Sequence, residues 1–138
     1  YEEMKRVYEL LAEAKNTQQF KTEEAWLKIF PAYSTKHFYF LDFDPKPAFE
    51  TAPKSEDNWR FAAMIYVIQE ALDVKLLECT REGNTGRLEF YPYGYPYGGI
   101  TALTMFLNSF DCKATEIDDG GQLYLVKWES EDKLSLKF

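Results

Sequence analysis

The class of the fold is decided by residues 75–91, which read Lys75-Leu76-Leu77-Glu78-Cys79-Thr80-Arg81-Glu82-Gly83-Asn84-Thr85-Gly86-Arg87-Leu88-Glu89-Phe90-Tyr91. Two apolar-rich runs, 75–81 and 87–91, flank a five-residue connection that contains two glycines and an asparagine. Such a connection is typical of the turn of a β-hairpin, because these residues tolerate positive φ angles. The stretch therefore predicts two neighbouring antiparallel strands.

A second hairpin is predicted near the end of the chain. Residues 112–117 and 122–128 flank Asp118-Asp119-Gly120-Gly121, which is again a strong turn sequence. Leu134 and Leu136 follow with the alternation of a short edge strand.

Helical periodicity appears on both sides of the first hairpin. Residues 56–73 carry apolar side chains three and four positions apart, after Ser55 as a capping residue. A helix that opens near Thr101 repeats this spacing through Phe110. Upstream, residues 1–15 predict an amphipathic helix, and Thr22 is expected to cap a short second helix.

Residues 36–43, Lys36-His37-Phe38-Tyr39-Phe40-Leu41-Asp42-Phe43, are dense in aromatic side chains and predict a strand buried on both faces. With this strand, the order after the two leading helices is βαββαβ, which is ferredoxin-like. We therefore expect an α+β fold, an antiparallel sheet with helices packed on one face. We also expect one domain over 1–138, with an N-terminal helical segment at 1–31 and a sheet-and-helix core at 36–128.

Composition limits the classes of partner. The 138 residues carry a formal net charge of −7, and the acids are spread along the chain. Such a field repels the phosphates of nucleic acids and anionic membranes, so we expect neither as a partner. No run of 18 apolar residues is present, and the expected location is the cytoplasm. Cys79 and Cys112 lack the spacing of a metal site and are expected as free thiols, unless neighbouring strands bring them together as a disulfide.

The most unusual motif is the tandem Tyr91-Pro92-Tyr93-Gly94-Tyr95-Pro96-Tyr97-Gly98. Tyrosine offers a large contact area and a hydroxyl group at a small cost in rotamer entropy, while proline limits backbone freedom. Gly98 and Gly99 open the following helix, whose free amides suit an anion. The predicted binding surface is formed by Tyr91, Tyr93, Tyr95, Tyr97, Gly98, Gly99 and Glu89. The alternative is a packed loop whose rings cover the core.

Asp42-Phe43-Asp44 follows the apolar run and resembles the first motif of the haloacid dehalogenase-like phosphotransferases. The resemblance implies Asp42 as nucleophile and Asp44 as general acid and base, with Mg²⁺ alongside. It covers about six residues, and the chain departs from the family at Pro45-Lys46-Pro47, where the family has small residues. The family's parallel sheet also differs from the two hairpins predicted here.

The sequence contains one histidine, His37, and none of the common catalytic motifs. We expect a non-enzymatic protein-interaction module without cofactor or metal, an immunity- or antitoxin-like binder of a basic partner, of bacterial origin. This expectation rests on an analogy of composition: an acidic, aromatic-rich chain of one domain. The alternatives are a small-ligand or anion-binding domain and a minor Mg-dependent phosphotransferase that uses Asp42 and Asp44.

Overall fold

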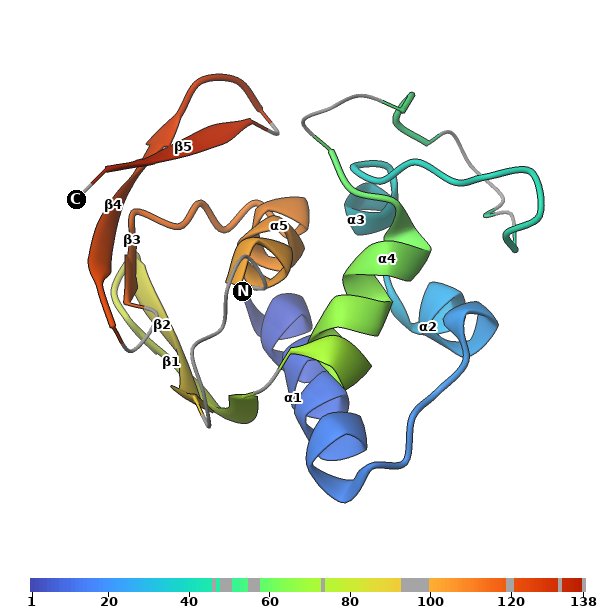
Figure 1. The fold of residues 1–138 in the computed structure, drawn as a ribbon, viewed down its shortest axis with the longest axis horizontal. Coiled ribbons are helices and arrows are strands. Elements are labelled where there is room, and N and C mark those ends of the chain that lie inside the picture. Colours follow the sequence, from blue (N-terminus) through green and yellow to red (C-terminus); the bar gives the residue numbers. More distant parts are fainter. Residues whose placement is uncertain are drawn as a thin grey trace.

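The computed structural model describes residues 1–45, 47, 51–54, 58–72, 74–92, 100–118, 121–131 and 133–137. It has an α+β architecture with antiparallel sheets (Figure 1). The helices are α1 (Glu2–Thr17), α2 (Glu23–Ile29), α3 (Ala32–Thr35), α4 (Phe61–Tyr66), its π-helical continuation η1 (Val67–Ala71), and α5 (Ile100–Ser109). The strands are β1 (Val74–Glu82), β2 (Thr85–Pro92), β3 (Glu116–Asp118), β4 (Leu123–Trp128) and β5 (Leu134–Lys137).

The first two helices confirm the periodicity and capping predicted for them. α1 begins with two glutamates, which the helix dipole favours, and is capped at its C-terminus by Gln18, whose φ of 57° is left-handed. Its buried stripe consists of Met4, Val7, Tyr8, Leu11 and Ala14. In α2, the Thr22 side chain accepts a hydrogen bond from the Ala25 amide at 3.2 Å.

The strands fall into two sheets rather than one. β1 and β2 form an antiparallel pair, with an irregularity in the register between Leu76 and Cys79. β3, β4 and β5 form a separate antiparallel sheet in sequential order, which includes the predicted edge strand. The ferredoxin-like order is therefore not confirmed. In Figure 1 the β1–β2 hairpin lies against α1, and contacts between α1 and β1 support this view.

The strand predicted at 36–43 is wrong. The segment follows α3 as a series of turns, and Tyr39 forms only an isolated parallel bridge with Arg60. Two of its aromatic side chains, Phe38 and Phe40, pack against a helix instead of a sheet. The Phe38 ring meets the Phe61 ring edge-on at 5.7 Å, and the Phe40 ring stacks on it at 5.5 Å. Phe38 is buried and Phe40 partly buried, whereas Phe43 is exposed, and the hydrogen-bond pattern of a strand is missing from the segment.

The helix predicted at 56–73 begins later and changes its geometry. α4 starts at Phe61, and residues 55–57 lie outside the described part of the chain. Over Val67–Ala71 the helix widens to π geometry. The buried Gln69 lies in this turn, where its side chain bonds the chain before α2: Oε1 accepts from the Lys21 amide at 2.8 Å and Nε2 donates to the Lys21 carbonyl at 3.1 Å.

The Phe30 ring is the centre of the aromatic core. It follows α2 and lies 5.1 Å from the Phe61 ring of α4. It also lies 5.8 Å from both the Phe106 ring of α5 and the Phe110 ring just after it. One side chain therefore joins three helical segments, and Phe30 itself is buried.

Replacing Phe30 should lower the stability of the whole chain. We expect Phe30→Ala to reduce the free energy of unfolding by about 3–5 kcal/mol, because it opens a cavity between three helical segments. Phe20→Ala is the matched control, since the Phe20 side chain is exposed and its loss should change stability by less than about 0.5 kcal/mol. Urea denaturation followed by circular dichroism measures both. Equal effects of the two substitutions would contradict the central role of Phe30.

Candidate functional site

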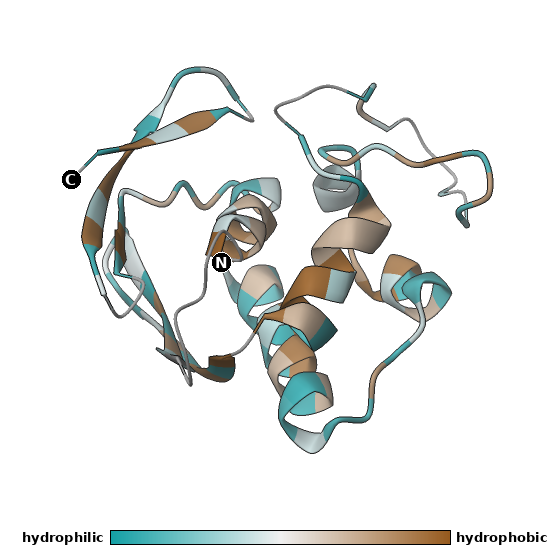
Figure 2. Ribbon diagram, viewed as in Figure 1, coloured by the Kyte–Doolittle hydropathy of each residue, from teal (hydrophilic) through white to brown (hydrophobic). Residues whose placement is uncertain are grey.

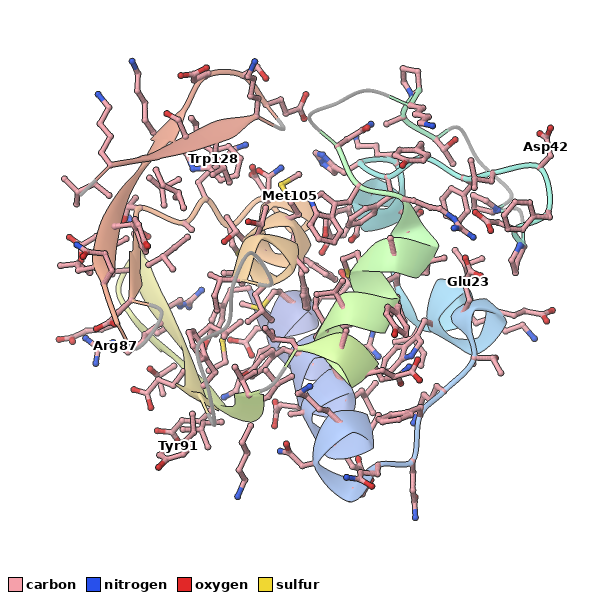
Figure 3. All side chains as sticks on the ribbon, in the orientation of Figure 1. Glu23, Asp42, Arg87, Tyr91, Met105 and Trp128 are labelled. Carbon is pink, nitrogen blue, oxygen red and sulfur yellow. The ribbon has the colours of Figure 1, made fainter. Side chains whose placement is uncertain are left out.

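The outward side of the β1–β2 hairpin carries the exposed part of the predicted site. Leu88 and Phe90 pair with Cys79 and Leu76, which are buried, so these pairs face the core. Side chains alternate along a strand, and Glu89 and Tyr91 therefore point outward. The Tyr91 side chain is 57% exposed. Figure 3 shows Arg87 and Tyr91 on the side of the hairpin that faces away from the helices.

An irregularity in β1 adds two side chains to this surface. Leu77 and Glu78 lie between the paired residues Leu76 and Cys79, whereas only Glu89 lies between their partners on β2. This is the pattern of a β-bulge, in which two residues oppose one. Leu77 and Glu78 are both exposed. We define the hairpin outer face as Lys75, Leu77, Glu78, Arg87, Glu89 and Tyr91.

Helix α1 holds the backbone beneath this face. The hydroxyl group of Tyr8 donates a hydrogen bond of 2.9 Å to the Glu89 carbonyl. Burial raises the pKa of Tyr8 above its ordinary value, so the phenol stays a neutral donor. Asn16 Nδ2 donates to the Leu76 carbonyl at 3.0 Å. Both strands are thus tied to one helix, and the outer face is fixed from behind.

Charges on the hairpin outer face are of both signs. Arg87 Nη1 lies 3.8 Å from Glu89 Oε1. The Arg87 side chain is largely in solvent and that of Glu89 is partly exposed, so this pair adds little to stability. Lys75 lies directly across from Tyr91 in the register. The face therefore offers an aromatic ring and an aliphatic side chain among two acids and two bases.

The predicted site residues are placed only in part. Tyr91 and Glu89 lie on the hairpin outer face. Tyr93, Tyr95, Tyr97, Gly98 and Gly99 lie outside the described residues. Leu77 was missed, although the bulge that exposes it interrupts the strict alternation of buried and exposed residues in β1.

The acidic turn at Asp42-Phe43-Asp44 is organised by Arg60, a residue that no sequence motif indicates. Arg60 Nε and Nη2 donate to the two carboxylate oxygens of Asp44, at 2.9 and 2.5 Å. The Leu41 amide donates to the same carboxylate at 2.8 Å, and the Asp44 side chain is buried. This bidentate pairing is typical of a structural ion pair. Asp42 is exposed, and the Phe43 ring, 78% exposed, lies 5.0 Å from the Arg60 guanidinium.

Glu23 lies next to this ion pair. Among the described residues, its Oε1 atom is the one buried side-chain oxygen or nitrogen that has no hydrogen-bond partner. Burial is the largest cause that raises the pKa of Glu23, and the negative charge of Asp44 raises it further. Arg60 opposes these effects but is already bonded to Asp44. Figure 3 shows Glu23 at the end of α2 that lies nearest the acidic turn.

The remaining buried polar side chains have structural partners. Ser34 donates to Ser109 at 2.7 Å, and Ser109 donates to the Phe106 carbonyl. Asn108 donates to the Glu131 carbonyl at 3.1 Å, which ties the β4–β5 connection to α5. Within the described ranges, no group of three or more His, Cys, Asp or Glu side chains is placed to hold a metal ion. Cys79 and Cys112 are free thiols, and burial raises the pKa of each.

Comparisons of the chain with protein-family models, with curated proteins and with solved structures each found no match. No helix in the described part of the chain is long and apolar enough to cross a membrane.

Replacing Glu23 should stabilise the chain near neutral pH. The pKa of Glu23 is higher in the folded state than in the unfolded state, so the folded state binds this proton more tightly. Stability is therefore lost as the pH rises through the interval between the two values. We expect Glu23→Gln to raise the midpoint of urea unfolding at pH 7, and this gain to shrink as the pH falls through the raised pKa towards the ordinary value of 4.5.

Glu24→Gln is the matched control, because Glu24 is exposed in the same first turn of α2 and shares the effect of the helix dipole. If the Glu23→Gln chain is no more stable at pH 7 than the Glu24→Gln chain, the carboxylate of Glu23 is not destabilising in the folded state and the raised pKa is contradicted.

Proposed function

We propose that this chain is a non-enzymatic protein-interaction module, of the immunity or antitoxin type, that binds a basic protein partner through the hairpin outer face. The observation that carries the proposal is the position of Tyr91. Its ring is 57% exposed on a strand whose backbone is anchored to the core through Tyr8. The proposal includes a bacterial, cytoplasmic setting.

The chemistry of the hairpin outer face fits recognition of a protein. Interface hot spots are enriched in tyrosine, tryptophan and arginine, surrounded by residues that exclude water. Here Tyr91 is accompanied by the exposed Leu77, with Glu78 and Glu89 beside them. Because α1 holds the backbone in place, little conformational freedom is lost when a partner binds.

The charge of the chain supports a basic partner. The hairpin outer face carries two acids and two bases, so its local charges would set the orientation of the partner. The net charge of −7 supplies the long-range attraction. We therefore expect association to slow as the salt concentration rises.

The buried polar groups also favour binding over catalysis. Gln69, Ser34, Ser109 and Asn108 bond to the backbone or to each other. Asp44, the proposed acid and base of a phosphotransferase, is bonded to Arg60. No observation in the described residues favours the anion site at Gly98 and Gly99, so that alternative stays a prediction from sequence.

Tyr91 and Tyr66 form a matched pair for testing the proposal. The Tyr66 side chain on α4 is 56% exposed, against 57% for Tyr91. We expect Tyr91→Ala to abolish the capture of a basic protein from the source organism, because it removes the central ring of the contact. Tyr66→Ala should leave that capture unchanged. A pull-down with mass spectrometry identifies the captured protein, and thermal unfolding shows whether both variants keep the melting temperature of the parent chain.

The pull-down has two results that would refute this surface. One is an equal loss of binding in both variants, and the other is full binding by Tyr91→Ala. A captured partner of acidic isoelectric point would refute the charge argument.

A further inference from the structure

β4 exposes leucines on the face that points away from the core. Leu123 and Leu125 are 53% and 52% exposed, while Tyr124, Val126 and Trp128 between and after them are half-buried. Figure 2 shows hydrophobic segments along β4 at the outer side of the molecule. A strand with one side in water normally carries polar residues on that side. The outward side of β4 is apolar at Leu123 and Leu125 and becomes charged at Lys127, so the half of the strand with the leucines has the pattern of a strand that is covered on both sides.

The register places opposite charges on the two sides of this leucine row. Leu125 pairs with Glu116 of β3 on one side and with Lys137 of β5 on the other. Directly paired residues of antiparallel strands project from the same face. Glu116 and Lys137 are both exposed. The outward face therefore presents an acid, a leucine and a base in one row across three strands.

This row is complementary to itself, and we propose that the face binds a second copy of the chain. With strands about 4.8 Å apart, Glu116 and Lys137 lie at nearly equal distances from Leu125. A two-fold axis between two copies, parallel to β4, would place Leu125 against Leu125. The same axis would place Glu116 of each copy against Lys137 of the other, so the attractive charge pair occurs twice. It would also bring the two Lys127 side chains opposite each other once, beyond the leucines, which opposes the contact.

Packing of two sheets tolerates this arrangement. Aligned sheets pack about 10 Å apart with a rotation of about 30°, and the long glutamate and lysine side chains span the resulting offset. Leu123 pairs with Asp118 of β3 and extends the apolar row along β4. Because the sheet has only three short strands and each copy carries a net charge of −7, the dimer should be weak and should strengthen with added salt.

The surface is separate from the hairpin outer face, because it lies on the other sheet. Formation of the dimer therefore does not depend on whether the proposed partner binds. Tyr91→Ala should bind a second copy as well as the parent chain does.

Charge reversal tests the two-fold arrangement. Sedimentation velocity over a concentration series gives the dissociation constant of the dimer. We expect Glu116→Lys alone and Lys137→Glu alone each to weaken the dimer about tenfold, because each reversal creates two like-charged contacts. The double variant Glu116→Lys with Lys137→Glu should restore the parent affinity. Leu125→Thr should weaken the dimer while it keeps a residue that suits a strand.

Circular dichroism of each variant shows whether the fold is retained. A monomeric mass for the parent chain at every concentration would overturn the proposal. The proposal would also be overturned if the double variant bound a second copy no more tightly than the weaker of the two single variants. A direct contact between Glu116 and Lys137 requires that the second charge reversal restore the affinity lost through the first.

Discussion

The contacts of the Phe30 ring are the constraint on which the rest of the structure depends. They set the position of α5 through Phe106 and of α4 through Phe61. The Phe106 ring in turn lies 6.5 Å from the ring of Tyr8 on α1, and the Tyr8 hydroxyl holds the backbone of β2 at Glu89. A continuous series of contacts thus runs from the centre of the core to the strand that carries Tyr91. Many of the aromatic residues of the chain therefore serve to build the core and do not take part in recognition directly.

Much of this architecture could be predicted from local sequence. The periodicity of α1 and α5, the Thr22 cap and the two hairpins depend on residues that are close in the chain, and the structure contains them. The first strand of the second hairpin is shorter than predicted, because β3 begins at Glu116 and residues 112–115 are not part of a strand. The segment 36–43 was mispredicted because aromatic side chains favour strands and buried helical contacts alike. Contacts with a distant residue separate these outcomes, since Phe38 and Phe40 pack on the ring of Phe61. The division of the strands into two sheets depends on tertiary packing in the same way.

In the candidate sites, too, local sequence predicts exposure along a strand but does not predict contacts between distant residues. Tyr91 could be predicted as exposed, because it follows the alternation of β2. The pairing of Asp44 with Arg60 could not, because sixteen positions separate the two residues and no periodicity connects them. That pairing changes how the Asp42-Phe43-Asp44 motif is interpreted, because the carboxylate of Asp44 is bonded to the guanidinium of Arg60 in the same chain. The resemblance to a phosphotransferase motif rested on residue types, and the contacts of Asp44 give it a structural use.

If α1 holds the β1–β2 hairpin rigid, the backbone under the recognition face should open rarely. Hydrogen exchange of the native chain, followed by NMR or mass spectrometry, measures this opening. We expect the hydrogen-bonded amides of β2 around Glu89 to exchange about as slowly as those of α1, because Tyr8 and Asn16 couple the hairpin to that helix. Exchange of these amides at the rate of an open loop, while α1 stays protected, would contradict the rigidity of the hairpin.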